Sequence, residues 1–109
     1  MSKSIKIVHD GKTYTLSYTK RTVQEMERNG FIAEKTDEMT ATMIPMLFYG
    51  AFLRNHRFTK DNVKEEIWER ITDKPGLIAA LIDLYNEAMM FLVDEPEDEA
   101  KKVGWTMEE

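Results

Sequence analysis

The chain has 109 residues, a net charge of −5 and no Cys, with 42% hydrophobic and 32% charged residues. Its length suits one domain with a modest core, and its composition is globular rather than that of a chain disordered throughout. The absence of Cys excludes disulfides, thiolate metal sites and thiol catalysis.

The charge is unevenly distributed along the chain. Residues 1–21 carry a net charge of +4, whereas residues 94–109 carry seven acids against Lys101 and Lys102, a net charge of −5. A non-specific nucleic-acid binder is expected to carry a basic surface, so this balance argues against one. The N-terminus lacks the apolar run of a signal peptide, and Met39–Leu53 is too short and interrupted for a membrane span. We therefore expect a cytoplasmic protein with no membrane partner.

The first 18 residues predict a β-hairpin. Ile5–Val8 and Thr13–Tyr18 are rich in β-branched and aromatic residues, and Asp10-Gly11 lies between them. Asp-Gly flanked by such runs favours a tight turn, because Gly accepts a positive φ. Large side chains alternate onto one face of the second run at Tyr14, Leu16 and Tyr18. That face needs a partner, since an isolated hairpin is only marginally stable.

Two helices are predicted in the next part of the chain. The first begins near Thr19, where Thr22–Glu25 fits a capping box, and stops at Gly30, which can adopt the left-handed conformation. The second spans Met43–Arg54, with Pro45 in its first turn, where no N–H is needed. This helix is apolar all round, so we expect it to be largely buried, with close approach of another element at Gly50 and Ala51.

Two further helices follow. Thr59 is expected to cap the third, with Lys64 facing water and an apolar stripe formed by Val63, Ile67 and Ile71. Pro75 marks the start of the fourth helix, predicted over Leu77–Leu92, and its apolar arc is wider than one core contact requires.

No constellation of catalytic or metal-binding residues is present in the sequence. The chain lacks Gly-x-Ser-x-Gly, His-Glu-x-x-His and a Gly-rich phosphate loop, and its two histidines are His9 and His56. We expect His56, between Arg54 and Arg57, to be a cation at a helix C-terminus. The acidic run at 94–99 lacks EF-hand spacing and is typical of a solvated charge run. We therefore expect no enzyme, no catalytic residue, no metal and no cofactor.

The excess of apolar residues indicates a surface that binds another protein chain. Methionine adapts its shape and is frequent on surfaces that accept varied helices. We expect the side chains of Met46 and Met89 to lie in the core, whereas Met90 is the better candidate for an exposed side chain. Trp105 is either a clamp on its own domain or an anchor for a partner. The candidate partner-binding residues are Met46, Phe48, Phe52, Met89, Met90 and Trp105.

A second reading of the hairpin is nucleic-acid binding. Lysines and tyrosines together can neutralise phosphates and stack bases, and residues 1–21 contain both. The alternative is a tyrosine face buried against the helices, with the lysines in solvent. We favour burial because the rest of the chain is not basic, and so expect no nucleic-acid partner.

Four parts of the chain, in this order, carry a resemblance to a known family: Asp10–Tyr14; Tyr18–Glu27 followed by Gly30-Phe31; Thr42–Phe52 with His56; and Leu84–Glu87 with Asp94–Asp98 and Trp105. Together they resemble a family of small phage and prophage proteins from Gram-positive hosts. Proteins of this kind are usually placed among the tail assembly chaperones of long-tailed phages. The resemblance covers most of the chain, and its motifs are structural rather than chemical.

The resemblance implies a protein without an enzymatic site that takes part in virion assembly. Such chaperones bind the long, helical, aggregation-prone tape-measure protein before the tail tube assembles around it. They are commonly made in two lengths by ribosomal frameshifting and are absent from the finished virion. The family has no defined interaction motif, so no binding residue is transferred from it.

The sequence thus predicts an α+β fold: an N-terminal β-hairpin packed on a bundle of about four helices in a single domain, residues 1–93. An acidic, flexible tail follows at residues 94–109. The predicted function is that of a tail assembly chaperone in the bacterial host cytoplasm, bound to the tape-measure protein or another helical phage protein. The sequence does not give the oligomeric state, and a homo-oligomer is one of the options. The alternatives are a nucleic-acid-binding phage regulator using the basic N-terminal hairpin, or a virion tail or connector structural protein.

Overall fold

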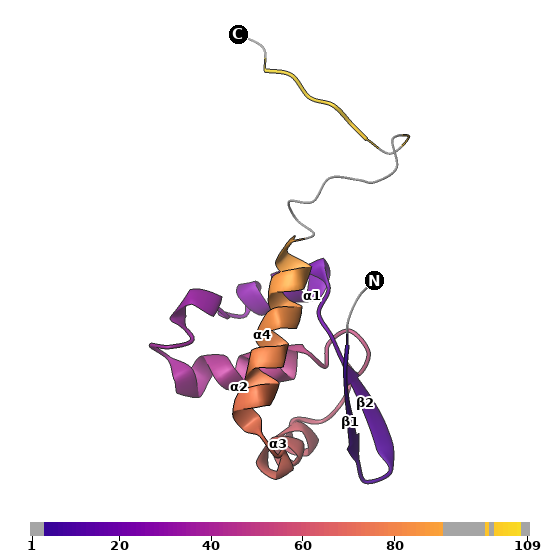
Figure 1. The fold of residues 1–109 in the computed structure, drawn as a ribbon, viewed down its shortest axis with the longest axis vertical. Helices are drawn as coiled ribbons and strands as arrows, with labels where there is room; N and C mark the ends of the chain where they lie inside the picture. The colour runs from indigo at the N-terminus through magenta and orange to yellow at the C-terminus, as the bar shows by residue number, and fades with distance from the viewer. Residues whose placement is uncertain (1–3, 91–99, 101, 108–109) are drawn as a thin grey trace.

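A hairpin and four α-helices make up the fold (Figure 1), which confirms the predicted α+β class. The computed structural model describes residues 4–90, 100 and 102–107, so the acidic run at 94–99 lies outside the described residues. The elements are β1 (Ile5–His9), β2 (Lys12–Leu16), α1 (Lys20–Arg28), the 3₁₀ turn η1 (Ala33–Lys35), α2 (Thr40–Gly50), α3 (Asp61–Arg70) and α4 (Lys74–Met90).

The hairpin turn has the geometry that its sequence predicts. Asp10 and Gly11 both have positive φ, 51° and 75°, as a two-residue type I′ turn requires. The antiparallel register runs from Ile5 opposite Leu16 to His9 opposite Lys12. The predicted face of β2 and the residues after it is buried against the helices, with Tyr14, Leu16 and Tyr18 at most 6% exposed.

The segment after α2 covers the outer edge of β2. The Thr15 N–H donates to Nε2 of His56 at 2.9 Å, and the Asn55 side chain donates to the Thr15 carbonyl at 3.2 Å. The Ser17 N–H donates to the Ala51 carbonyl, also at 3.2 Å. These bonds satisfy strand groups that would otherwise be open to pairing with another chain.

The N-cap of helix α1 is Thr19, three residues before the first residue of the predicted capping box. The Thr19 hydroxyl accepts from the Thr22 N–H at 3.1 Å, and the Thr22 hydroxyl accepts from the Thr19 N–H at 2.9 Å. The box is therefore Thr19 with Thr22, and the expected Thr22–Glu25 box is wrong because Thr22 lies inside the helix. The predicted stop at Gly30 is confirmed: φ is 102° there, and the Phe31 N–H bonds to the Met26 carbonyl, as in a Schellman motif.

Helix α2 starts and ends earlier than predicted. The Met39 N–H bonds to the Lys35 carbonyl and the Thr40 hydroxyl to the Thr36 carbonyl, so hydrogen-bonded turns connect η1 to the start of α2, where Met39 is the N-cap. Pro45 consequently lies inside the helix, on its exposed side, rather than in the first turn. At the other end, the Ala51 N–H bonds to the Phe48 and Tyr49 carbonyls rather than to the Leu47 carbonyl, as it would in a continued α-helix. The Leu47 carbonyl accepts a hydrogen bond from the buried Tyr18 hydroxyl at 2.5 Å.

Two expectations about α3 are wrong. Its N-cap is Lys60 and no side chain forms a capping hydrogen bond, so Thr59 does not cap this helix. Lys64 is buried rather than in water, with 7% of its surface exposed. Its ammonium lies 3.3 Å from Oδ1 of Asp61 and 5.2 Å from the centre of the Tyr49 ring. A long aliphatic stem can pack on apolar surface while its charge reaches an acid and an aromatic face.

Helix α4 is the longest helix and crosses α2 (Figure 1). Pro75 lies in its first turn as predicted, and the Asp73 carboxylate accepts from the Gly76 N–H at 3.2 Å. The helix begins at Lys74 rather than Leu77, and the described part ends at Met90. Its buried residues Leu81, Leu84, Tyr85 and Ala88 contribute to the core shared with α1, α2 and the hairpin. In the described part of the chain, no helix has the length and hydropathy needed to cross a membrane.

Candidate functional site

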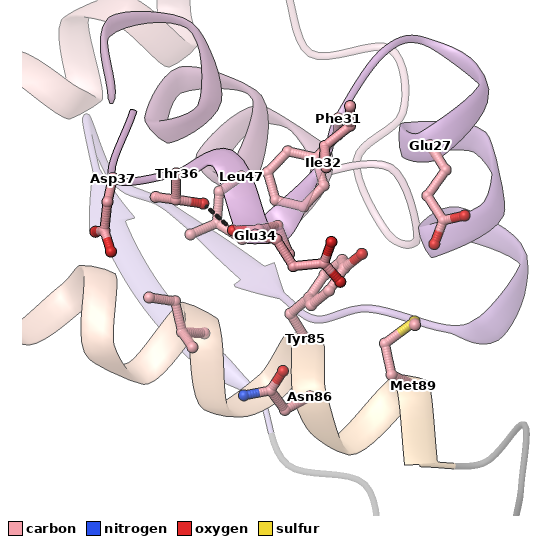
Figure 2. A pocket seen from close by; sticks show the side chains of 12 residues that line it. Glu27, Phe31, Ile32, Glu34, Thr36, Asp37, Leu47, Tyr85, Asn86 and Met89 are labelled. Atoms are coloured by element: carbon pink, nitrogen blue, oxygen red, sulfur yellow. Dashed lines mark hydrogen bonds between the residues drawn. The ribbon is translucent and has the colours of Figure 1, made fainter. Parts of the chain in front are cut away.

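A groove with an apolar floor runs between α4 and the loop that precedes α2, and we call it the α4 groove. Twelve residues from α1, this loop, α2 and α4 line it, and its volume is about 740 Å³. Figure 2 shows Tyr85 and Met89 rising from α4 toward the loop that carries Ile32 and Glu34. The groove is therefore formed where α1, the loop, α2 and α4 meet.

Buried aromatic and aliphatic side chains form the floor of the α4 groove. Phe31 and Leu47 are each 2% exposed and Tyr85 is 5% exposed. The Phe31 and Tyr85 rings meet edge to face with their centres 5.2 Å apart, and the Tyr18 and Tyr85 rings meet edge to face at 5.8 Å. Since these side chains belong to the core, the floor has a fixed shape.

Partly exposed apolar side chains stand above this floor. Ile32 is 42% exposed and Ile82 is 38% exposed, and Met89 is partly buried beside them. At the end of α4, Met90 is 59% exposed. Apolar surface that stays open around a concave site is typical of a surface that binds another molecule.

The loop wall, residues 32–39, is held mainly by short-range bonds. The Thr36 hydroxyl donates to the Ala33 carbonyl at 2.6 Å, drawn as the dashed line in Figure 2. The Ile32 N–H reaches Sδ of Met43 at 3.4 Å, which joins the start of the wall to α2. All residues of the wall are exposed except Thr36, which is partly buried.

The rim of the α4 groove is acidic. Glu27, Glu34 and Asp37 lie among the twelve lining residues, and none of those twelve is Lys, Arg or His. Burial raises the pKa of the Tyr85 hydroxyl, and the charges of Glu27 and Glu34 raise it further. The two carboxylates thus impose a negative potential on the groove, which favours a cationic or neutral occupant.

The structure separates the six predicted partner-binding residues into three groups. Met89 lines the groove, and Met90 follows it on the exposed end of α4. Phe48 and Phe52 are 0% exposed, inside the core, and Met46 packs partly buried against that core. Trp105 is 83% exposed in the segment 102–107. Of the six residues, the groove therefore includes Met89, with Met90 next to it in the chain, and excludes Phe48 and Phe52.

Sequence reasoning missed most of the residues that form the site. Ile32, Glu34, Asp37 and Ile82 line the groove, and none of them is among the predicted partner-binding residues. Ile32 and Met39 are large apolar residues at the two ends of the mostly polar stretch 33–38. Apolar residues kept in an exposed loop indicate a surface with a binding role.

The histidine after α2 has a different state from the one predicted. Nε2 of His56 accepts the Thr15 N–H, so His56 is a neutral acceptor rather than a helix-terminal cation. Burial lowers the pKa of His56, and the charge of Lys12 lowers it further. The Tyr14 ring packs against it with the ring centres 5.2 Å apart.

We expect His56 to make folding stability depend on pH in a defined window. Its pKa is lower in the folded state, so the unfolded chain takes up this proton more readily. The contribution of His56 to stability is therefore present above about pH 6.5, its unfolded value, and is lost as the pH falls below that value. Urea unfolding between pH 5 and 7.5 should show this decline in the free energy of unfolding, and His56→Gln should flatten it. A chelator in the buffer keeps metal ions from contributing to the pH dependence. A decline of equal size in His56→Gln contradicts the assignment.

The basic hairpin does not present its aromatic residues to solvent. Tyr14 and Tyr18 are each 6% exposed and pack on the helices. The Lys12 ammonium lies 5.1 Å from the centre of the Tyr14 ring. Base stacking needs an open aromatic face, so these two rings are not placed for it.

The fold and the groove define a small α+β domain with a hairpin, four helices and an open, acidic-rimmed apolar site. The chain belongs to the family described as a domain of unknown function (DUF5055), whose model matches residues 1–108. No curated protein and no solved structure matches the chain.

Proposed function

We propose that this protein is a phage tail assembly chaperone that holds a helical segment of the tape-measure protein before the tail tube assembles. The observation that carries the proposal is the α4 groove, with its fixed apolar floor, exposed apolar sides and acidic rim. The resemblance of the sequence to phage tail assembly chaperones supports the choice of this partner over other helical proteins.

The dimensions of the groove suit the side chains of one face of a helix. Its volume of about 740 Å³ accommodates several large apolar side chains but not a whole helix, whose diameter is about 10–12 Å. An amphipathic helix can lay its apolar face into such a groove through residues at i, i+3 or i+4, and i+7. Ile82, Met89 and Met90 would provide the adaptable contacts on the α4 side.

The acidic rim defines the charge of the segment that binds. Lys or Arg residues flanking the apolar face of the client would lie near Glu27, Glu34 and Asp37. Such pairs at an exposed rim mainly affect association rate and partner choice, and their effect weakens with salt. The expected client segment is therefore apolar on one side and basic at its edges.

The test is co-expression of the full chain with the tape-measure protein encoded beside it, followed by size exclusion and a binding titration. Ile82→Asp should weaken the complex about tenfold or more, because a carboxylate must be desolvated against the apolar face of the client. Ile82 is 38% exposed, so the fold should tolerate the change. The matched control is Phe58→Asp, at a residue that is 94% exposed and outside the groove.

The rim is tested in the same titration. Glu34→Lys with Asp37→Lys should weaken binding and reduce its salt dependence, whereas Glu65→Lys with Glu69→Lys on exposed positions of α3 should not. Wild-type binding by Ile82→Asp, or no rescue of the tape-measure protein from aggregation, contradicts the proposal. Detection of the chain in purified virions would favour a structural role instead.

A further inference from the structure

A histidine and two carboxylates meet where the hairpin turn approaches α3. Nε2 of His9 lies 3.4 Å from Oδ2 of Asp10 and 3.5 Å from Oε2 of Glu66. One ligand atom from each residue falls within 4.8 Å of the other two. His9 and Asp10 are neighbours at the end of β1 and in the turn, whereas Glu66 lies in the middle of α3, far from them in the sequence.

His9 itself indicates that this cluster holds a ligand. Its side chain is 10% exposed, and Nε2 is buried with no hydrogen-bond partner among the described residues. A buried ring nitrogen without a partner costs free energy, so such atoms are rare in folded proteins. The contacts of 3.4 and 3.5 Å to the carboxylates are too long to be good hydrogen bonds, yet both oxygens face the nitrogen.

We propose that His9, Asp10 and Glu66 bind one Zn²⁺ ion, through Nε2 and one oxygen of each carboxylate. Zinc binds imidazole nitrogen and carboxylate oxygen at about 2.0–2.2 Å, which in a tetrahedral site places neighbouring ligand atoms about 3.3–3.6 Å apart. The two measured separations from Nε2, 3.4 and 3.5 Å, match this geometry. Water, or a side chain of a bound protein, would take the fourth position.

The surroundings of the two acids allow them to act as ligands. Asp10 is 75% exposed, so its carboxylate can turn toward the ion without disturbing the core. Glu66 uses Oε1 for Arg70 at 2.9 Å and directs Oε2 toward His9. The contact with Arg70 holds the Glu66 carboxylate in place, as the partners of metal ligands commonly do. An ion here would join the tip of the hairpin to α3.

The test is a titration of the full chain, without an affinity tag and stripped of metal, with ZnCl₂. We expect one Zn²⁺ per chain and a melting temperature raised by about 5 °C or more at a hundredfold excess over the dissociation constant. Because the chain has no Cys, Co²⁺ should give the intense visible absorption of a tetrahedral nitrogen–oxygen site without a thiolate band.

Matched variants locate the site. His9→Gln and Glu66→Gln should each weaken Zn²⁺ binding about tenfold or more, whereas His56→Gln and Glu65→Gln should leave it unchanged. Equal binding in His9→Gln, or no binding by the wild-type chain, overturns the proposal. Should a variant fail to fold, NMR of the wild-type chain decides: the ring signals of His9 must shift with Zn²⁺ and those of His56 must not.

Discussion

Phe48→Ala is expected to lower the free energy of unfolding by about 3–5 kcal/mol, as removal of a buried aromatic ring typically does. Phe48 is 0% exposed, and its ring centre lies 5.0 Å from that of Trp68 and 5.2 Å from that of Phe52. The change leaves a cavity between α2 and α3 and removes favourable edge and tilted ring contacts. Because small domains are stable by only about 5–15 kcal/mol, much of the total stability is lost.

Urea unfolding followed by circular dichroism measures this effect, with Phe58→Ala as the matched control. Phe58 is the same residue type at 94% exposure, so its truncation should change the free energy of unfolding by less than about 0.5 kcal/mol. Similar losses in both variants would show that Phe48 is not in the core. The comparison also bears on partner binding, because any loss of binding by Phe48→Ala must be corrected for the unfolded fraction.

Gly50→Ala is expected to destabilise the protein by about 1–2 kcal/mol, although Ala favours helix over Gly by up to about 1 kcal/mol. A Cβ at Gly50 would lie 2.5 Å from Sδ of Met26 and 2.8 Å from its Cε. Met26 is 3% exposed, so its side chain cannot move into solvent without disturbing the contact between α1 and α2. The steric cost therefore exceeds the gain in helix propensity.

A double-mutant cycle with Met26→Ala isolates this contact. In the Met26→Ala background the space beside Gly50 is open, so Gly50→Ala should become neutral or stabilising. Gly104→Ala is the control, because a Cβ there meets nothing within 4 Å. If Gly50→Ala costs the same in both backgrounds, its effect comes from the backbone and not from Met26.

The sequence predicts the class of the fold and the regular parts of its elements. Asp10-Gly11 defines the hairpin, Gly30 ends α1, and the alternation of Tyr14, Leu16 and Tyr18 identifies the buried face. All three signals are local. The turn and the helix end depend on a positive φ that few residues adopt, and the buried face follows from the period of two along a strand. The close approach expected at Gly50 is also present, with Met26 as the neighbour.

What the sequence did not predict depends on contacts between distant segments. The charged neighbours of Lys64 on α3 predict that it faces water, but it is buried, with its ammonium over the rings of Tyr49 and Phe52. The place of His56 after an apolar helix predicts a cation at a helix C-terminus, but its partner is the Thr15 N–H, 41 residues away in the sequence. The α4 groove was missed for the same reason, since its wall and its floor come from separate segments.

The position of His9 on its strand indicates which way its side chain faces. Ile5, Ile7 and His9 alternate on β1 and share the partly buried side of that strand. A period of two along a strand places such a histidine on the same side as Ile5 and Ile7, toward the helices. The residue it meets, Glu66, can be identified only from the packing of α3 against the hairpin.

The loop wall of the α4 groove has a consequence for how long a client remains bound. Its exposed residues and local bonds make it a region that can open at lower free-energy cost than the core. A client helix could therefore leave, or shift by one turn, while the floor formed by Phe31, Leu47 and Tyr85 stays intact. Under the proposed function, the same chaperone could occupy many similar stretches of one long protein in succession and still dissociate when the tail tube forms around it.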